Sequence, residues 1–532
     1  MEKRQIVTTL FLLLIFFAAG FILRFQYIQD PTFPLGDGGL FFSMTNDLIE
    51  NNFRIPLFTT YNNSQIPYAY SPLAFYLAAG IHILLKIDLL KIFLWMPFLL
   101  NLCTIPLVFL FSKQFFKDNS YALITTAIWS ISMPAFEWLI MGGGLTRSLA
   151  YTASITSLLL LLIHLQTEKK SALLGMILFG GITALSHLEV FLVNCVSILV
   201  IWAYMKQKPL KRSIWLLVLY YLGCGLFLLP YILITINNHN FQLFINGFRG
   251  GEFSLLPQLF KIILFNYTQE FSINIVGVLA LLGIFFQIKK RDYLLVVWFF
   301  LILFIDPRSI NRSVILILCL LATIAIQQVV KPAFGGGPSN KKSVAADQFE
   351  NTPRKKRIPL FSVILAFLFL QVFSLVYFQF FVDNLTLYQV KIPARNAYDW
   401  INNNTTSDSK FLVLTSSPGW HLDHTAEWFP ALAHRTSIAT VQGTEWLPVG
   451  RYYKARLFNE TIKDCMVSDY SCISSLLDKE KISVDYIWVS KEKCENKSKI
   501  CTLPFLSRIR EDSNYQLVFE NDGVVIFSSN NY

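Results

Sequence analysis

The sequence predicts a polytopic α-helical membrane protein with a small α/β domain at its C-terminal end. The 532 residues are 54% hydrophobic and 15% charged, with a mean hydropathy of +0.49. That is too apolar for a soluble chain of this length. Many apolar stretches reach the roughly 20 residues that cross a bilayer as a helix. From about residue 382 onward, short β-type runs alternate with helical patterns.

We expect about eleven membrane-spanning helices, because a helix satisfies its own backbone polar groups inside lipid. The first apolar stretch lacks a small-residue cleavage site and is longer than the apolar region of a signal peptide, so it is predicted to be retained. The predicted spans lie near residues 6–24, 91–112, 120–138, 148–165, 171–187, 188–205, 213–235, 273–288, 293–306, 312–330 and 359–381.

The basic residues predict the orientation of these spans. The formal charge of +11 does not indicate a nucleic-acid partner, because Lys and Arg form short clusters between apolar stretches, as in cytoplasmic loops. Counting the short apolar segment 73–86 as a span would place nearly every later cluster outside. We therefore predict that it lies along the outer interface, with a cytoplasmic N-terminus and an extracytoplasmic C-terminus. The membrane is either the plasma membrane or the endoplasmic reticulum.

The predicted organisation is a membrane domain, 1–381, followed by an extracytoplasmic α/β domain, 382–532. The membrane domain carries outer loops at 25–91, with interfacial helices, and at 236–272, and a cytoplasmic linker at 331–358. In the C-terminal domain, strands are expected at 411–414, 486–489 and 523–527, and helices at 394–402 and 461–479. The chain shows no Walker or dinucleotide motif, which disfavours an ATP-driven pump.

Asn-X-Ser/Thr sites and cysteines agree with this topology. The sites lie only on segments predicted to be outside or at outer helix ends, although chance could also produce this in Asn-rich sequence. Four cysteines cluster in the external domain, where two disulfides of unspecified connectivity could form. These cysteines are Cys465, Cys472, Cys494 and Cys501, and the glycosylation candidates are Asn62, Asn266, Asn311, Asn384, Asn403, Asn404, Asn459 and Asn496.

The first outer loop combines an acidic residue, glycines and an aromatic-proline segment. Residues 34–47 read PLGDGGLFFSMTND, so Asp37 follows the first span and precedes a short helical segment, and residues 67–76 read PYAYSPLAFY. Asp37 could simply cap the following helix, a use of Asp that stabilises by about 1 kcal/mol. Asp47 and Glu50 are expected to be solvated helix positions.

This arrangement resembles the C-type membrane glycosyltransferases, which use a lipid-phosphate sugar donor at the outer or lumenal membrane face. The resemblance covers most of the membrane part, but the sequence lacks the Lys-Pro-Pro and Asp-X-Asp forms of some branches. It implies an inverting transfer from a polyprenyl- or dolichyl-phosphate donor to a glycan, lipid or protein acceptor. It also implies that Asp37 is the general base, a role that suits a carboxylate ionised at neutral pH.

The leaving group in such a transfer is an anionic phosphate, which needs cations on the same face. Arg308 and Arg312 in DPRSINR (306–312) and Arg147 in GGGLTR (142–147) are the candidates, and snorkelling to lipid head groups is the alternative for each. His187 and Glu189, with Glu137 at a similar depth, could contact the phosphate or a divalent metal such as Mg or Mn. Alternatively, His187 and Glu189 form a self-satisfied polar pair.

The external domain contains a segment rich in His, acidic and aromatic residues. It could hold the acceptor, bind a metal, or form a surface loop with an aromatic core anchor. Its placement is similar to the acceptor-recognition segment of oligosaccharyltransferases, but its residues do not match that motif. The candidates for the acceptor region are Trp420, His421, Asp423, His424 and Glu427.

Two other classes of function remain in contention at this point. A transporter or lipid flippase would also place charged residues in a helical bundle, but the polar residues here gather at one face and no repeat relates two halves. A non-catalytic scaffold with an external binding domain would leave Asp37 and the arginines dispensable.

Overall fold

The computed structural model describes residues 2–205, 210–244, 264–267, 270–306, 309–333, 387–468, 470–491 and 500–529. The predicted span at 359–381 and most of the predicted linker and second outer loop lie outside the described residues. So do Arg308, Cys494, Asn384 and Asn496.

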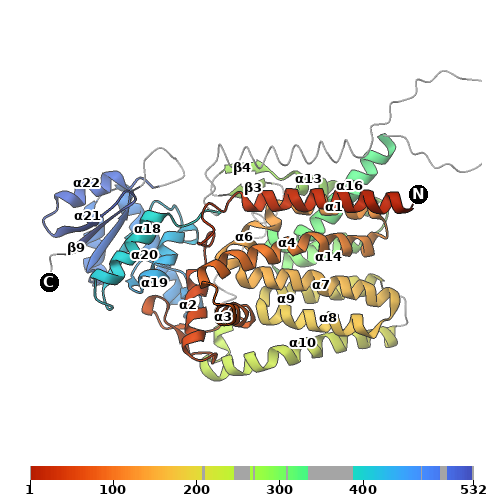
Figure 1. Ribbon diagram of the computed structural model, residues 1–532, viewed down its shortest axis with the longest axis horizontal. Coiled ribbons are helices and arrows are strands. Elements are labelled where there is room, and N and C mark those ends of the chain that lie inside the picture. The colour runs from red at the N-terminus through yellow and green to blue at the C-terminus, as the bar shows by residue number, and fades with distance from the viewer. Residues whose placement is uncertain are drawn as a thin grey trace, which may run out of the picture.

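The chain forms a long helical bundle with a sheet-containing unit at the end away from the N-terminus (Figure 1). Among the described residues, five helices are long and apolar enough to cross a membrane, or six if a bent pair counts as one span. Shorter apolar helices complete the bundle, so the chain is a multi-pass membrane protein, while the expectation of about eleven spans stays a prediction. The bundle helices are α1 (Glu2–Phe25), α4 (Leu89–Phe116), α5 (Asn119–Ile131), α6 (Glu137–Ile140), α7 (Leu145–Thr167), α8 (Lys170–Ser186), α9 (Leu188–Met205), α10 (Leu210–His239), α13 (Ile275–Lys289), α14 (Leu294–Ile305), α15 (Ile310–Ser313) and α16 (Ile315–Ala333).

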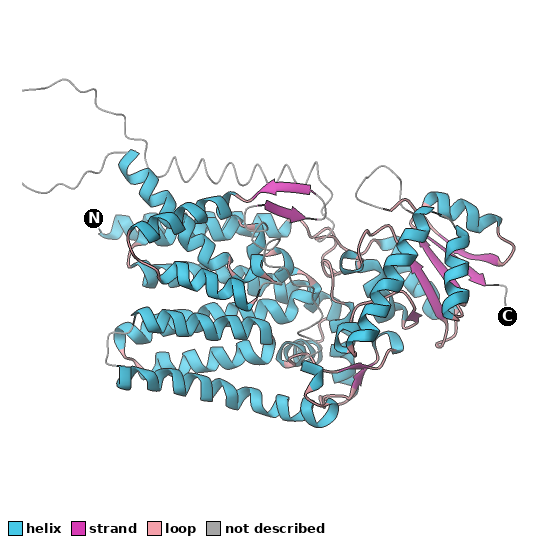
Figure 2. Cartoon of the chain, turned by 180° about the vertical axis from the view of Figure 1, so that it is seen from behind, coloured by secondary structure: helices cyan, strands magenta, loops and turns pink. Residues whose placement is uncertain are grey.

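The first outer loop has the elements that the sequence predicts. A short helix follows Asp37, and the apolar segment at 73–86 forms a helix seen nearly end-on while α7 to α10 run lengthwise (Figures 1 and 2). A helix across the bundle in this way fits the predicted interfacial placement. The elements are α2 (Gly39–Glu50), β1 (Phe58–Thr59), η1 (Tyr61–Asn63), β2 (Ile66–Pro67) and α3 (Leu73–Leu85); the hairpin β3 (Leu264–Tyr267) and β4 (Glu270–Ile273) precedes α13.

The predicted span at 120–138 corresponds to two helical pieces, because the chain bends between α5 and α6. The pieces 119–131 and 133–140 meet at 86°, and the second begins with the 3-10 turn η2 (Met133–Ala135), which contains Pro134. Proline lacks the N–H that would continue the helix. A broken helix leaves carbonyl groups without intrahelical partners, and these must be satisfied by other groups inside a membrane.

A buried arginine from the first helix donates hydrogen bonds to polar groups next to this break. Arg24 donates from Nη1 to the carbonyl of Ser130 at 2.7 Å and from Nε to Oδ1 of Asn101 at 2.7 Å. Asn101 in turn donates to the carbonyl of Ala135 at 2.9 Å. The guanidinium also lies 4.5 Å from the ring centroid of Phe136. Arg24 therefore holds the bend in place, a role that its position at the end of an apolar stretch does not reveal.

The C-terminal unit is a five-stranded mixed sheet with helices on both faces, in the order β6-β5-β7-β9-β8. β5 pairs in parallel with β6 and β7, whereas β9 pairs antiparallel with β7 and β8. The three predicted strands correspond to β5, β7 and β9, while β6 and β8 were not predicted. The predicted helix at 461–479 is wrong as one element, because that range is divided between α20 and α21. The elements are α18 (Ile392–Asn404), β5 (Lys410–Leu414), η4 (Trp420–Leu422), α19 (His424–Ala433), β6 (Thr436–Ser437), η5 (Thr444–Trp446), α20 (Val449–Ser468), α21 (Tyr470–Glu480), β7 (Tyr486–Ser490), α22 (Leu503–Glu511), β8 (Tyr515–Glu520) and β9 (Val524–Ser529).

One face of this sheet shares its hydrophobic core with the first outer loop. Along β5, Phe411 and Val413 point to one core and Leu412 and Leu414 to the other, as the period of two in a strand requires. The first core also contains buried residues of α2, α3 and α19, including Trp428. The outer loop and the sheet unit are therefore packed into one core.

We expect Arg24→Met to destabilise the protein by roughly 3 kcal/mol, because two buried acceptors lose their donor. Thermal unfolding in detergent measures this effect. Arg4→Met, at the exposed end of the same helix, is the matched control and should leave the melting temperature unchanged. Equal melting temperatures for both variants would show that Arg24 does not hold the bend.

Candidate functional site

Asp37 lies in a loop whose backbone is packed against a glycine turn. We call residues 34–39 the Asp37 loop and Gly142–Gly144, which form η3, the glycine turn. Gly142 N donates to the carbonyl of Leu35 at 2.8 Å, and Gly143 N donates to the carbonyl of Asp37 at 2.7 Å. Gly38 has a φ of +143°, which an L side chain rarely adopts. The loop conformation is thus set by backbone bonds that only glycine allows.

The Asp37 loop approaches the glycine turn and Glu427 too closely for a side chain to lie between them. A Cβ on Gly143 would lie 2.5 Å from Oδ1 of Asp37, and one on Gly38 would lie 2.9 Å from backbone atoms of Gly142 and Gly143. A Cβ on Gly39 would lie 2.5 Å from the carbonyl oxygen of Glu427. These glycines therefore bring three distant segments of the chain into contact around one carboxylate.

The C-terminal unit also packs against the Asp37 loop. Trp428 donates from its indole nitrogen to the carbonyl of Gly36 at 2.9 Å, and Gly36 N donates to the carbonyl of Tyr388 at 2.8 Å. The indole is fully buried and contacts the rings of Phe33 and Phe42. The loop is therefore held by the glycine turn of the helical bundle and by the C-terminal unit at once.

The Asp37 carboxylate remains partly accessible within this frame. Its side chain is 17% exposed, and Oδ2 lies 3.9 Å from Nη2 of Arg147. Among the described residues, Oδ1 is buried and has no hydrogen-bond partner. A carboxylate oxygen without a partner, next to a cation, can accept a proton from a bound molecule. Asp37 is not the N-cap of α2, whose cap is Gly38 without a side-chain bond.

Arg147 and Arg312 come together on Trp138. Arg147 donates from Nη1 to the carbonyl of Trp138 at 3.2 Å, and Cζ of Arg312 lies 5.7 Å from the Trp138 ring centroid. The charges of the two guanidinium groups interact unfavourably with each other. Two cations held side by side form a site that favours an anion. The structure thus brings two of the three predicted arginines into one place, and Arg308 lies outside the described residues.

His187 and Glu189 lie beside Arg312, together with Asp306. Glu189 lies close to the side chains of Asp306 and Ser309, and its charge interacts with those of His187 and Arg312. Asp306 accepts hydrogen bonds from Ser313 and from the backbone N–H of Ser309. Asp306 was not predicted as a site residue, although it begins the segment 306–312 whose arginines were predicted.

Glu137 occupies the first position of α6, directly after the break, and is 2% exposed. Among the described residues, no group of three His, Cys, Asp or Glu side chains is arranged to hold a metal ion. Zinc sites take three or four protein ligands, whereas Mg²⁺ usually binds through one or two carboxylates together with substrate phosphates. The described side chains therefore form no closed cage for a metal, and the expected divalent metal stays a prediction.

The predicted acceptor region divides into exposed and buried residues. His421 is exposed and Trp420 is partly exposed. Asp423 caps α19 by accepting from Ala426 N at 3.1 Å and forms an ion pair with Lys463 at 3.4 Å. His424 is fully buried against Tyr388. Only the first two thus face solvent.

Glu427 lies beneath the Asp37 loop and is 6% exposed. Its Oε1 accepts a hydrogen bond from Gly38 N at 3.0 Å. Burial and the negative charge of Asp37 raise the pKa of Glu427 well above its usual value. This residue therefore joins the Asp37 loop, which the spacing in the sequence could not indicate.

Asp47 is buried, which corrects the expectation that it is solvated. It accepts hydrogen bonds from the backbone N–H of Thr60 at 3.0 Å and from the Thr60 hydroxyl at 2.6 Å. Burial raises the pKa of Asp47. Its role is to fasten α2 to the β1 end, whereas Glu50 is exposed as expected.

Two glycosylation candidates are engaged by the fold. Asn62 donates to the carbonyl of Ser437 at 3.0 Å and accepts from its N–H at 2.7 Å, and Asn459 donates to the carbonyl of Ala439 at 2.8 Å. Both are buried, so these amides are not accessible to a transferase in the folded protein. Asn403 and Asn404 are exposed on α18. Asn266 falls in β3 and Asn311 in α15.

The external cysteines form disulfides. Cys465 and Cys472 are bonded across the junction of α20 and α21, and Cys501 is disulfide-bonded too. The four cysteines of the bundle helices are free thiols. Disulfides in this part agree with its predicted extracytoplasmic location.

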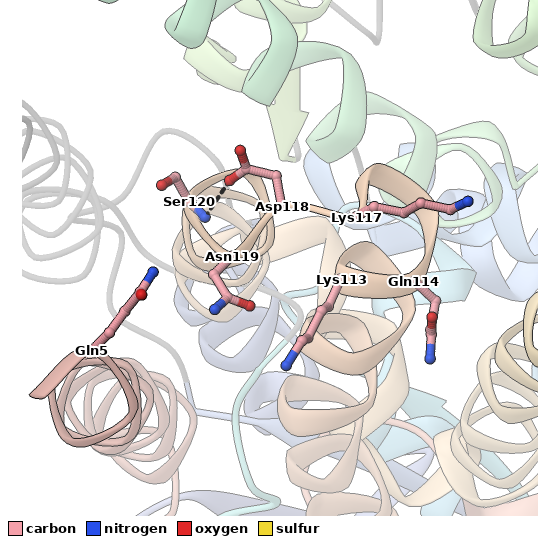
Figure 3. Close-up of a pocket in the computed structure, with 7 residues that line it drawn as sticks. All are labelled: Gln5, Lys113, Gln114, Lys117, Asp118, Asn119 and Ser120. Atoms are coloured by element: carbon pink, nitrogen blue, oxygen red, sulfur yellow. Dashed lines mark hydrogen bonds between the residues drawn. The ribbon is translucent and has the colours of Figure 1, made fainter. Parts of the chain in front are cut away.

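A polar pocket of about 480 Å³ lies far from Asp37, where α1 begins and α4 passes into α5 (Figure 3). It contains Lys113 and Lys117, for which the basic clusters in the sequence predict a cytoplasmic location. Asp118 accepts from Ser120 N at 2.6 Å and so caps α5. Because it is at the opposite end of the bundle, this pocket is not part of the Asp37 site.

Comparison with known sequences finds no relative. No protein-family model matches the chain, and no curated protein matches it.

Comparison with solved structures, by contrast, finds neighbours over nearly the whole chain. The archaeal oligosaccharyltransferase AglB from Archaeoglobus fulgidus, solved with an inhibitory peptide and dolichol-phosphate, has a TM-score of 0.59 at 13% identity, covering 91% of this chain and 69% of that one. ArnT from Cupriavidus metallidurans, bound to undecaprenyl phosphate, has a TM-score of 0.53 at 14% identity, covering 97% of each chain. The likeness at this identity concerns the fold. The chain shares the fold of AglB and ArnT.

Proposed function

We propose that the protein is an inverting glycosyltransferase that moves a sugar from a polyprenyl- or dolichyl-phosphate carrier to an acceptor at the extracytoplasmic membrane face. The observation that carries this proposal is the Asp37 carboxylate, held by backbone bonds with one oxygen unpartnered and Arg147 at 3.9 Å. The fold shared with AglB and ArnT supports it, since those structures hold dolichol-phosphate and undecaprenyl phosphate.

In the proposed reaction, a hydroxyl or amide group of the acceptor attacks the anomeric carbon of the sugar. The bond between that carbon and the carrier phosphate oxygen breaks, and the phosphate leaves with the bonding electrons. Asp37 takes the proton of the attacking group. One displacement at the anomeric carbon inverts its configuration, so donor and product have opposite anomers.

Arg147 and Arg312 are proposed to bind the carrier phosphate and to stabilise the charge that develops on it. Trp138 contacts both guanidinium groups, and Asp306 and Glu189 lie close to Arg312. His187, close to the same cluster, is proposed as a further phosphate contact. Trp420 and His421, which are not buried, remain the proposed acceptor contacts within the C-terminal unit.

We expect Asp37→Asn to lower transfer by about 10²–10⁴-fold, because the amide cannot accept the proton. The measurement is label transfer from a panel of lipid-phosphate sugars by purified protein in liposomes. Glu50→Gln, on the exposed end of α2, is the matched control. Full transfer by Asp37→Asn would remove Asp37 as the base, and no transfer by the wild type with any donor would favour the transporter or scaffold.

Gly143→Ala is expected to cost about 10²-fold in kcat with the fold retained. The new methyl group would lie 2.5 Å from Oδ1 of Asp37, and this flexible side chain can rotate away, which moves the base. The control is Gly450→Ala, where nothing lies within 4 Å of the added Cβ. Wild-type kcat in the Gly143 variant would contradict the proposed position of the base.

Arg312→Gln is expected to lower kcat/KM for the lipid donor by about 10–100-fold through loss of a charge-assisted phosphate contact. A titration of carrier lipid phosphate as a competitive inhibitor measures the same contact, and its inhibition constant should rise in parallel. Arg54→Gln, exposed on the outer loop, serves as the control. An unchanged inhibition constant would exclude Arg312 from the carrier site.

A further inference from the structure

Glu427 comes from the C-terminal unit, yet it accepts hydrogen bonds from the Asp37 loop and from Tyr61 of η1. Its Oε1 accepts from Gly38 N at 3.0 Å, and its main-chain oxygen accepts from the Tyr61 hydroxyl at 2.7 Å. Gly39 has no room for a Cβ because that same main-chain oxygen lies in its place. The loop residue directly after the proposed base is thus tied to α19.

The charged groups around Glu427 do not favour a second negative charge. Asp37 on the loop and Glu445 on η5 are acidic, and Tyr61 on η1 would add a further negative charge if it ionised. Arg147 on α7 is the cation that faces it, and Arg147 is also the ion-pair partner of Asp37. Burial is the largest cost for the charged form of Glu427.

We propose that Glu427 is a positioning residue for Asp37: its uncharged carboxyl group holds the backbone of the Asp37 loop, and a negative charge there would disturb the site. This inference rests on the proposed function. Glu427 itself is buried and does not touch the substrate, so it acts through the loop and through the electrostatic field at Asp37.

Two substitutions separate shape from charge. Glu427→Gln keeps an acceptor for Gly38 N and cannot ionise, whereas Glu427→Ala removes the acceptor and leaves a cavity beneath the loop. Glu460→Gln, in an exposed ion pair with Arg456 on α20, is the matched control. Because Glu427 holds the base and not the donor, we expect changes in kcat with little change in KM for the donor.

The first experiment is the pH profile of kcat for these variants. We expect the wild type to lose transfer at high pH as Glu427 ionises, and Glu427→Gln to keep transfer there and to resemble the wild type at neutral pH. Glu427→Ala should lose at least tenfold in kcat at every pH. A Gln variant as inactive as Asp37→Asn at all pH values, or one with the wild-type loss at high pH, would overturn the proposal.

The second experiment does not depend on transfer and uses thermal unfolding against pH. Because folding raises the pKa of Glu427, the wild type is penalised as pH rises above the ordinary glutamate value of about 4.3. The melting temperature of Glu427→Gln should therefore exceed that of the wild type by a margin that grows with pH. A margin independent of pH would overturn the inference, whereas a growing margin without transfer from any donor would count against the proposed function alone.

Discussion

The Asp37 loop and the glycine turn meet backbone to backbone, and the rest of the site depends on that contact. Two N–H···O bonds join them, and the missing Cβ atoms of Gly38 and Gly143 are what allow the distance. Glycine carries a conformational cost in the unfolded chain. In return, the backbone bonds of the glycines fix the Asp37 carboxylate in place without any side-chain bond to its Oδ1 atom. An aspartate held by its own backbone keeps its oxygen atoms for a ligand.

Much of the fold follows from hydropathy, because a span must be apolar over its whole length and its basic flanks stay on one side. Helices α3, α7, α8 and α9 lie within a few residues of their predicted bounds. The bend between α5 and α6 was missed, since hydropathy does not record direction and Pro134 is compatible with a kinked span. The sequence does not reveal the role of Arg24 in supporting that bend, because its acceptors on Asn101 and Ser130 belong to residues far away in the sequence.

The site could be predicted in its components but not in its assembly. Asp37, Arg147 and Arg312 were identifiable because charged residues at helix ends in a membrane are costly and need a reason. Glu427 was assigned to an acceptor region from composition alone. Its contact with Gly38 joins two residues that are 389 positions apart in the chain. Such pairs depend on tertiary packing, and a single sequence contains no record of it. The glycine triplet at 142–144 was a usable signal, since three successive glycines mark a place where another backbone approaches closely.

The shared hydrophobic core has a consequence for how the protein is made. The Asp37 loop is synthesised first, but the α19 residues that close over it are added 389 positions later, which is roughly 20 to 80 seconds of translation. During that interval Phe33, Phe42 and their neighbours lack the Trp428 ring that later covers them. The nascent chain therefore has all its early helices in the bilayer before the carboxylate is confined. Synthesis of α19, and not that of the early helices, is therefore the event that completes the packing around Asp37.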